Sequence, residues 1–326
     1  MSIRNRTPSS KIIIILGPTA SGKSSAAIRL AKKFNGEILS ADSRQIYRGM
    51  DIGTGKEPKD KSEVENQKFN IYWSDGIAHY GIDIVSPKTD YNVAKFKKYA
   101  DRVIADILQR GKLPIICGGT GFWIKAIVDD VIYPEVAPDP VLRSMLRNRT
   151  TDELFAELQK LDPERAAGID AKNPVRLIRA IEICQAIGKV PRQNRTSDVP
   201  NAFGHPMSKD RQFLQIGIKR EKEELNERIK LNVKKRFTAG MIEEVHKLHK
   251  SGLSWKKLAS FGLSYRLIPQ YLKEKNISEE ELIEKIYLAE KDYAKRQMTW
   301  FKKDARIIWL DEYQKIEKEV AKFLEK

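Results

Sequence analysis

Apolar residues follow two patterns along the chain, and each pattern predicts one kind of element. Short continuous apolar runs are typical of strands buried on both faces, as in a parallel sheet. Such runs lie within residues 12–16, 36–43, 79–87, 113–117, 213–218 and 306–310. Segments with helical spacing of apolar residues predict helices at 25–33, 92–110, 222–237, 241–249 and 279–301, with one more after the last strand. This alternation predicts an α/β fold with a parallel sheet flanked by helices.

The middle of the chain has a different composition. Three prolines between residues 133 and 140 mark a hinge, and helical segments follow one another to about Gly188. Pro174 is well placed to start a helix, and the polar stretch 192–210 predicts a loop that returns to the core. We therefore expect a helical domain that is inserted into the sequence of the core domain. The predicted domains are a core of residues 1–130 and 205–326 and an insertion of residues 131–204.

Composition narrows the class of protein. The 326 residues are 41% hydrophobic and 32% charged, which is typical of a soluble globular protein. No apolar run approaches the length of a membrane-spanning helix, and the basic N-terminus is not followed by a signal-peptide pattern. The two cysteines, Cys117 and Cys184, indicate neither a disulfide framework nor a metal site. We expect a protein of the reducing cytoplasm, with no membrane contact.

The net charge of +16 indicates a polyanionic partner. Basic side chains that neutralise phosphates release counterions and steer association, so an excess of this size favours nucleic acid binding. A general enrichment in lysine is the alternative, and the charge alone does not separate the two.

The segment between the first strand and the first helix fits the pattern G-x-x-x-x-G-K-[ST] of a phosphate-binding loop. It comprises Gly17, Pro18, Thr19, Ala20, Ser21, Gly22, Lys23 and Ser24. Glycines let the backbone wrap round an anion, and the helix N-terminus adds partial positive charge. The pattern predicts a P-loop NTPase-like fold that binds a phosphorylated ligand, with Lys23 on its phosphates and Ser24 as a ligand of Mg²⁺. A glycine-rich turn without a ligand is the alternative.

An acidic residue follows the second predicted strand. Ligands of α/β sheets bind at the carboxyl ends of the strands, so Asp42 is expected close to the phosphate loop. Kinases and nucleotide hydrolases that share this phosphate loop usually carry an acidic residue at the end of a buried strand, to hold Mg²⁺ or its water. The strand that ends at Cys117 is followed by Gly118-Gly119-Thr120, without a carboxylate. This pattern argues against a nucleotide-hydrolysing site.

Several motifs together resemble one family. They are the phosphate loop, Asp42 to Thr54, Gly118-Gly119-Thr120-Gly121, Asp139 to Arg143, Asn173 to Ala180 and Tyr293 to Phe301. In this order, between about residues 11 and 311, the set resembles the tRNA dimethylallyltransferases, also called tRNA isopentenyltransferases. The length and the helical insertion are similar to members that modify tRNA, not to shorter enzymes that act on free adenine nucleotides.

The resemblance implies a reaction and a set of catalytic residues. The phosphate loop would hold the diphosphate of dimethylallyl diphosphate with Mg²⁺, and Arg228 would also bind this diphosphate. The five-carbon group would pass to N6 of the adenosine just 3′ of the anticodon. Lys23 would stabilise the leaving diphosphate, because charge develops there in the transition state. Asp42 would act as the base at the target amine, and Thr120 would assist. The alternatives are a salt-bridged or helix-capping Asp42 and a Thr120 that is only a turn residue.

The resemblance also implies contacts with the tRNA anticodon stem-loop, from which the target base must be unstacked. The implied residues are Asp42, Ser43, Arg44, Gln45, Thr120, Arg143, Arg176, Arg179, Gly262, Tyr265 and Arg266. Any single basic residue could equally lie on a solvated helix face. A monomer is expected.

The chain departs from the family pattern at three places. Asn232 stands where many members have a second arginine, and Lys234, Lys235 or Arg236 could replace it at the diphosphate. The usual Gly-Tyr-Lys/Arg segment is represented by residues 261–266, Phe-Gly-Leu-Ser-Tyr-Arg. Lys95 replaces a common aspartate. None of these changes affects the phosphate loop, Asp42 or Thr120.

Three other functions stay open from the sequence. A small-molecule kinase would share the phosphate loop but would consume a nucleoside triphosphate. A non-catalytic RNA-binding protein would tolerate the loss of Lys23 or Asp42, and both are present. A transferase for free adenine nucleotides would leave the helical insertion and the positive charge unexplained.

Overall fold

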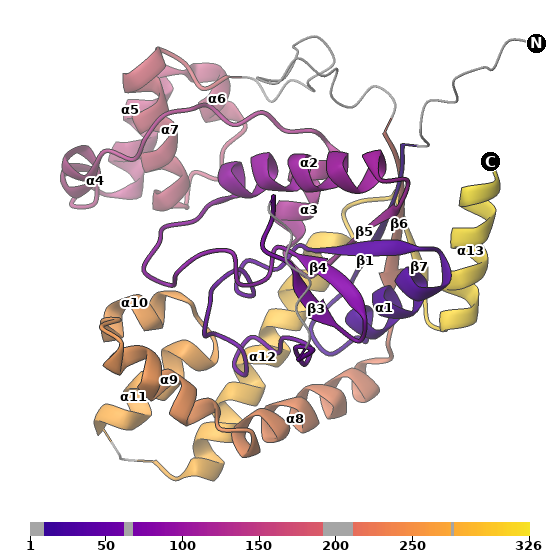
Figure 1. The fold of residues 1–326 in the computed structure, drawn as a ribbon. Coiled ribbons are helices and arrows are strands. Elements are labelled where there is room, and N and C mark those ends of the chain that lie inside the picture. The colour runs from indigo at the N-terminus through magenta and orange to yellow at the C-terminus, as the bar shows by residue number, and fades with distance from the viewer. Residues whose placement is uncertain (1–9, 62–67, 192–210, 275–276) are drawn as a thin grey trace, which may run out of the picture. The chain divides into compact units, whose positions relative to one another are not determined.

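The computed structural model describes residues 10–61, 68–191, 211–274 and 277–326 (Figure 1). The chain divides into two compact units: residues 1–128 with 207–326, and residues 129–206. Each unit has its own hydrophobic core. None of the helices in these ranges is long and apolar enough to cross a bilayer.

The first unit is built on one sheet. Its strands, within the described residues, are β1 (Lys11–Leu16), β2 (Gly36–Ser40), β3 (Tyr72–Ser74), β4 (Ile77–Tyr80), β5 (Leu113–Gly118), β6 (Gln212–Ile218) and β7 (Ile307–Leu310). Their order is β3-β4-β2-β5-β1-β6-β7, and every neighbouring pair except β3 with β4 is parallel. In register, Ile15 of β1 lies beside Cys117 of β5 and Ile216 of β6. The predicted α/β fold with a mainly parallel sheet is confirmed.

The apolar run of β1 is buried because helices cover both faces of the sheet. Residues 12–16 are fully inaccessible to solvent. Side chains alternate between the faces of a strand, so every second one joins the core formed with α2 (Val93–Gln109). The others join the core formed with α1 (Lys23–Lys33) and α13 (Tyr313–Glu325). Helices on both faces explain why this strand carries no polar residue after Lys11.

The remaining helices of the first unit pack on the larger core. They are α3 (Gly121–Val128), α8 (Lys222–Thr238), α9 (Met241–Lys250), α10 (Trp255–Ser260), α11 (Ser264–Glu274) and α12 (Glu279–Phe301). The sequence did not predict α10 and α11 as separate helices. The first is short, and Pro269 lies inside the second, which obscures the helical pattern.

The strand predicted within residues 79–87 is placed differently in the structure. It covers Ile77–Tyr80 and ends at Gly81, whose φ of 78° interrupts the extended backbone. It pairs with β3 through a two-residue turn, Asp75-Gly76, in which both φ angles are positive. Asp-Gly between short apolar runs is a strong hairpin signal, so the sequence contained this element although it was not predicted.

The second unit contains four helices among its described residues. They are α4 (Pro140–Leu146), α5 (Thr151–Leu161), α6 (Pro163–Ala167) and α7 (Pro174–Ile187). Leu154, Leu158 and Leu177 are completely buried in a small separate core. Pro174 starts α7, with the side chain of Asn173 as its N-cap, as expected for proline at a helix start. The loop predicted at 192–210 lies outside the described residues.

Candidate active site

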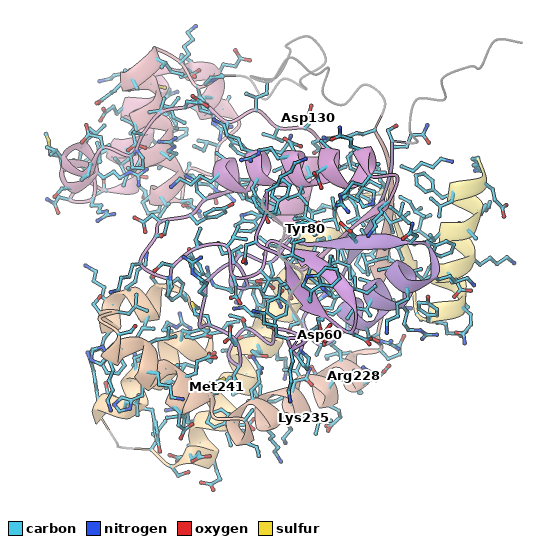
Figure 2. The ribbon with its side chains drawn as sticks, viewed as in Figure 1. Asp60, Tyr80, Asp130, Arg228, Lys235 and Met241 are labelled. Atoms are coloured by element: carbon cyan, nitrogen blue, oxygen red, sulfur yellow. The ribbon has the colours of Figure 1, made fainter. Side chains whose placement is uncertain are left out.

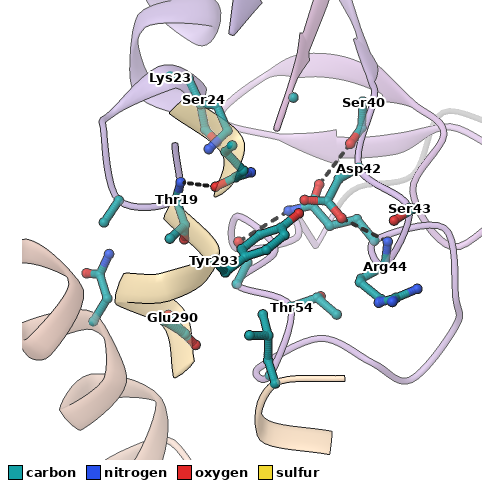
Figure 3. A pocket seen from close by; sticks show the side chains of 18 of the residues that line it. Thr19, Lys23, Ser24, Ser40, Asp42, Ser43, Arg44, Thr54, Glu290 and Tyr293 are labelled. Atoms are coloured by element: carbon teal, nitrogen blue, oxygen red, sulfur yellow. Dashed lines mark hydrogen bonds between the residues drawn. The ribbon is translucent and has the colours of Figure 1, made fainter. Parts of the chain in front are cut away.

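A cavity of about 850 Å³ lies at the carboxyl ends of the strands in the first unit (Figure 3). Lys23 and Ser24 enter it from the segment after β1, and Asp42 enters it from the segment after β2. Residues of α8, α11 and α12 complete its wall. The phosphate loop and Asp42 therefore face the same space, as the rule for ligand sites in parallel sheets predicts.

The phosphate loop has the backbone that an anion site needs. Ala20 and Gly22 take the left-handed conformation, with φ of 61° and 92°. Gly22 is also the N-cap of α1 and offers no side-chain cap, so the first N–H groups of the helix are available to an anion. The loop residues that line the cavity are Thr19, Ala20, Gly22, Lys23 and Ser24, whereas Gly17, Pro18 and Ser21 do not line it.

Lys23 is folded back into its own loop. Its Nζ donates a hydrogen bond to the carbonyl oxygen of Pro18 at 3.1 Å. Burial lowers the pKa of Lys23, and the nearby Cys117, Asp42 and Glu57 only partly oppose this shift. A bound diphosphate would supply the negative charge that favours the ammonium form.

Gln297 of α12 connects the phosphate loop to the end of β5. Its Oε1 accepts a hydrogen bond from the N–H of Thr19 at 2.9 Å, and its Nε2 donates to the carbonyl oxygen of Gly119 at 2.8 Å. A Cβ atom on Gly119 would lie 2.2 Å from that Nε2, so a side chain there would displace the Gln297 amide. The sequence placed Gln297 in a family motif but gave it no role.

Asp42 is held by an Asx turn. Its Oδ1 accepts a hydrogen bond from the N–H of Arg44 at 2.8 Å. Thr120 lies beside this turn and is not among the residues that line the cavity. Its Oγ1 accepts from the N–H of Ser43 at 3.1 Å, and its own N–H donates to Ala41 at 3.2 Å. These contacts position the Asp42 segment, and a direct catalytic role for Thr120 stays a prediction.

Gln45 and Tyr293 also line the cavity. Gln45 accepts from Ser40 Oγ at 2.9 Å and donates to the carbonyl oxygen of Gly55 at 3.4 Å. Figure 3 shows the hydroxyl of Tyr293 directed toward Asp42. Burial, followed by the charge of Asp42, raises the pKa of Tyr293 to about 12, so the phenol stays neutral. The sequence did not single out Tyr293 as a site residue.

One face of α8 brings basic side chains to the cavity. Arg228, Asn232 and Lys235 lie one helical turn apart and all line it, and Figure 2 labels the first and the last. Arg228 Nε donates to Glu224 at 2.9 Å. Arg236 also lines the cavity but is bound to buried Glu290 at 2.6 Å. Lys234 does not line it, so Lys235 is the best-placed substitute for the arginine expected at Asn232.

Apart from Thr120, which does not line the cavity, the residues predicted to contact tRNA fall into two groups. Those that line the cavity are Asp42, Ser43, Arg44, Gln45, Gly262, Tyr265 and Arg266. Within this group, the guanidinium of Arg44 lies 6.0 Å from the centre of the Phe261 ring. The other group, Arg143, Arg176 and Arg179, belongs to the second unit.

Glu182 engages two of the three arginines in the second unit. Arg143 donates to both of its carboxylate oxygens at 2.8 Å, and Arg179 donates to one of them. Burial alone would raise the pKa of Glu182, but these hydrogen bonds and the N–H of Asp139 lower it to about 2. Arg176 is different, because its side chain is 56% exposed and lies 3.8 Å from Asp170. Arg176 is therefore the most accessible cation of this set.

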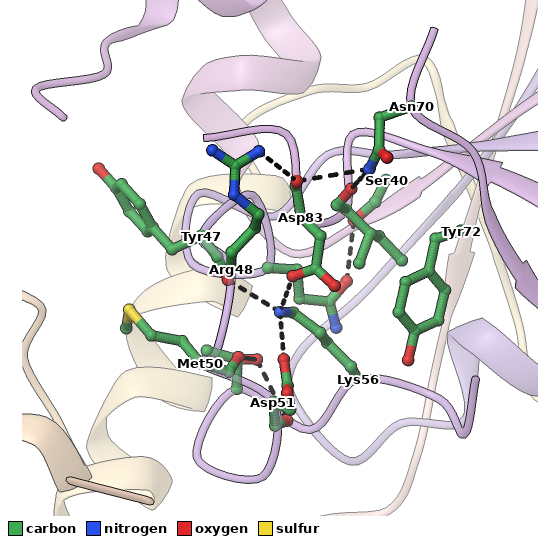
Figure 4. Close-up of polar contacts among 12 residues, drawn as sticks. Ser40, Tyr47, Arg48, Met50, Asp51, Lys56, Asn70, Tyr72 and Asp83 are labelled. Carbon is green, nitrogen blue, oxygen red and sulfur yellow. Dashed lines mark hydrogen bonds and ion pairs between the residues drawn. The ribbon is translucent and has the colours of Figure 1, made fainter. Parts of the chain in front are cut away.

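Lys56 holds the glycine-rich loop after Asp42 in place (Figure 4). Its side chain is 1% exposed and its Nζ donates to Asp51 at 2.6 Å, to the carbonyl oxygen of Tyr47 at 2.8 Å and to Asp83. The sequence indicated only a loop here, since the partners of Lys56 follow no recognisable spacing.

The cavity has the donor set that Mg²⁺ needs beside a diphosphate. The described residues contain no cluster of three or more His, Cys, Asp or Glu side chains that would hold a metal ion alone. Mg²⁺ commonly takes one or two protein oxygens and completes its shell with phosphates and water. Ser24, Asp42 and Glu57 bring hydroxyl and carboxylate oxygens to this cavity. The residues present therefore fit the ion, with Ser24 as the predicted ligand.

Comparison with known proteins identifies the family. The family profile described as IPP transferase matches residues 45–304. A tRNA dimethylallyltransferase from Endomicrobium trichonymphae is 42% identical over 301 residues, which cover 92% of this chain and 94% of the relative. tRNA dimethylallyltransferase 1 from Syntrophus aciditrophicus (strain SB) is 38% identical over 315 residues, 95% of this chain and 97% of the relative.

Solved structures agree with the sequence comparison. The full-length tRNA isopentenylpyrophosphate transferase from Bacillus halodurans matches with a TM-score of 0.65 and 32% identity, covering 97% of this chain and 96% of that one. A eukaryotic dimethylallyltransferase acting on tRNA matches with a TM-score of 0.70 and 25% identity, covering 92% and 73%. The match extends over nearly all of the chain, and the protein belongs to the IPP transferase family, together with the tRNA dimethylallyltransferases.

Proposed function

We propose that this protein transfers the dimethylallyl group of dimethylallyl diphosphate to N6 of the adenosine just 3′ of the anticodon in tRNA. The products are N6-isopentenyladenosine and diphosphate. The observation that carries the proposal is the single cavity into which both the phosphate loop and Asp42 project. Alkylation of an amine requires a site for the leaving group and a proton acceptor close to the amine. The phosphate loop would bind the leaving diphosphate, and Asp42 would accept the proton.

The reaction follows from the groups that line this cavity. The bond between the allylic carbon and the diphosphate oxygen breaks while the bond between that carbon and N6 forms. Lys23 and the N–H groups of the phosphate loop stabilise the charge that develops on the leaving diphosphate. Asp42 accepts the proton that N6 loses, and its Asx turn holds the carboxylate in position. Bound Mg²⁺ would neutralise diphosphate charge, with Ser24 as its protein ligand.

The tRNA side of the proposal rests on charge and on side chains at the cavity. The chain carries a net charge of +16, and Arg44 and Arg266 line the same cavity as Asp42. Phosphate contacts from arginine and lysine orient an RNA, and an extruded base can then enter a pocket. We extend the proposal to Arg176 in the insertion, as a contact with the anticodon stem-loop, and to a monomer that works in the cytoplasm.

Transfer of radiolabel from dimethylallyl diphosphate to unmodified tRNA, with Mg²⁺, tests this function. Label is expected in the tRNA, mapped to the adenosine after the anticodon by nuclease digestion. Label that enters only free adenine nucleotides would move the protein to a smaller substrate. ATP consumption without any transfer would contradict the proposal and favour a kinase. Gel filtration with light scattering tests the monomer.

A further inference from the structure

We propose that Glu244 is a positioning residue that holds residues 51–53 of the cavity loop, which comprises residues 51–55, in the conformation needed for the nucleic acid substrate. The inference rests on the proposed function for its kinetic part only. Glu244 lies on α9 and is 8% exposed. It is not among the residues that line the cavity, whereas Gly53, Thr54 and Gly55 of the loop line it. Glu244 thus acts on the substrate through the loop.

The carboxylate of Glu244 is the acceptor for three successive backbone N–H groups. Oε2 accepts from Asp51 at 2.7 Å and from Ile52 at 2.6 Å, and Oε1 accepts from Gly53 at 3.0 Å. The loop has no regular hydrogen-bonding ladder, so without this partner three donors would be left unsatisfied. Hydrogen bonds to an ionised acceptor are roughly twice as strong as neutral ones. One side chain therefore satisfies the N–H groups of three successive peptides.

Tyr265 connects the same carboxylate to α11. Its hydroxyl donates to Glu244 Oε1 at 2.6 Å. A Cβ atom on Gly53 would lie 2.6 Å from that hydroxyl oxygen, so the glycine backbone packs directly on the tyrosine ring. Both Gly53 and Tyr265 line the cavity. The carboxylate therefore fixes the loop relative to a helix that also brings Arg266 to the cavity.

The carbonyl group of Gly53 is held as well. Its carbonyl oxygen accepts from Arg236 Nη1 at 3.1 Å, and Arg236 is fixed by Glu290 at 2.6 Å. Two residues further on, the carbonyl oxygen of Gly55 accepts from Gln45 Nε2 at 3.4 Å. The loop thus links Glu244 to Gln45 in the segment that carries Asp42. Gln45 belongs to the segment implied to contact the target base, whereas Gln297 holds the phosphate loop.

Two measurements on Glu244→Gln test the inference, with Glu243→Gln as a matched control on the exposed face of α9. Hydrogen exchange of the Asp51, Ile52 and Gly53 amides reports the anchor without any substrate. We expect at least tenfold faster exchange at one or more of these amides in Glu244→Gln, because the NH₂ group that replaces one carboxylate oxygen cannot accept a hydrogen bond. Exchange in the control is expected to be unchanged. In transfer assays, kcat/KM for tRNA is expected to fall by about 10- to 100-fold, while KM for dimethylallyl diphosphate stays within about twofold.

The outcomes separate this inference from the proposed function. A wild-type protein that transfers no label contradicts the function, whereas the exchange measurement still stands. Unchanged exchange at residues 51–53, or an equal loss of affinity for both substrates, would overturn the role of Glu244. If Glu244→Gln does not fold, Tyr265→Phe removes one hydrogen bond of the four. It is expected to raise the exchange rate at Gly53 about threefold, and no change there would equally overturn the inference.

Discussion

The N–H of Thr19 donates to Gln297 Oε1 at 2.9 Å, across 278 positions of sequence. This bond makes the last long helix a support for the phosphate loop. Gln297 also donates to Gly119, so one amide joins the ends of two strands. The proposed diphosphate site therefore depends on the C-terminal part of the chain as well as on its own motif.

Replacing Gln297 by Ala is expected to weaken binding of dimethylallyl diphosphate. The loop would lose a buried partner for Thr19, which corresponds to about 1–2 kcal/mol. We expect KM for this substrate to rise about tenfold, with KM for tRNA nearly unchanged. Steady-state kinetics with each substrate varied in turn checks the split. Gln314→Ala on the exposed face of α13 is the control, and an equal rise of both KM values would count against the assignment.

Glu37 makes the unfolding free energy depend on pH. Burial raises its pKa, but hydrogen bonds from Arg110, Lys112 and Tyr80 outweigh this effect and lower it to about 2 from an ordinary 4.5. The folded state therefore binds the proton more weakly than the unfolded state. The stabilisation is fully present above pH 4.5 and is lost as the pH falls toward 2.

Denaturant unfolding between pH 7 and pH 2 measures this dependence. Between pH 7 and pH 2, the unfolding free energy of wild type is expected to fall by about 2–3 kcal/mol more than that of Glu37→Gln, because position 37 of the variant has no carboxylate to protonate. Glu223→Gln, an exposed glutamate of α8, should behave as wild type. Parallel curves for wild type and Glu37→Gln would show that the pKa of Glu37 is not lowered by folding.

Replacing Lys56 by Met is expected to loosen the loop behind the cavity. The change leaves Asp51 and Asp83 without their shared cation, and the cost is roughly 2–3 kcal/mol of unfolding free energy. Because the loop carries cavity residues, we also expect a fall in kcat for tRNA. Thermal unfolding and transfer assays measure both, with the exposed Lys256→Met as control. A variant as stable and active as wild type would show that Lys56 is not needed to hold this loop.

Replacing Arg143 or Arg176 of the insertion by alanine is expected to affect different properties, stability in the first case and tRNA binding in the second. Arg143→Ala leaves Glu182 buried with one fewer partner, so the second unit should lose about 2 kcal/mol of stability. Arg176→Ala removes an exposed cation, so tRNA binding should weaken about threefold and its salt dependence should fall by about one unit. Binding titrations at several salt concentrations, with thermal unfolding, separate the two. Equal effects on binding would contradict this division.

Local patterns made the core of the site predictable. The apolar run before Gly17, the loop motif and the helix after it are contiguous, so their conformation follows from short-range physics. Asp42 was predicted beside the loop because parallel strands end at a common edge. Charge and the ordered set of motifs indicated the tRNA-modifying family, which the comparisons confirm.

The unpredicted parts depend on contacts between distant segments. Gln297, Glu244 and Lys56 act through backbone groups elsewhere in the chain, and no spacing in the sequence encodes those partners. The sequence also contained no sign that Thr120 Oγ1 accepts a hydrogen bond from the N–H of Ser43; the role of Thr120 in the reaction stays a prediction. Arg143 was predicted to contact the tRNA, and only the fold shows that Glu182 engages it.

The central claim is that Asp42 accepts the proton of the target amine in the cavity that binds the diphosphate. Single-turnover transfer by Asp42→Asn, with enzyme in excess over tRNA, tests it most directly, alongside equilibrium binding of both substrates. We predict a fall in the transfer rate of about 10²- to 10⁴-fold, with both dissociation constants within about threefold of wild type. Asp152→Asn, an exposed aspartate of α5, should transfer at the wild-type rate. Transfer by Asp42→Asn at a rate close to wild type would contradict the account.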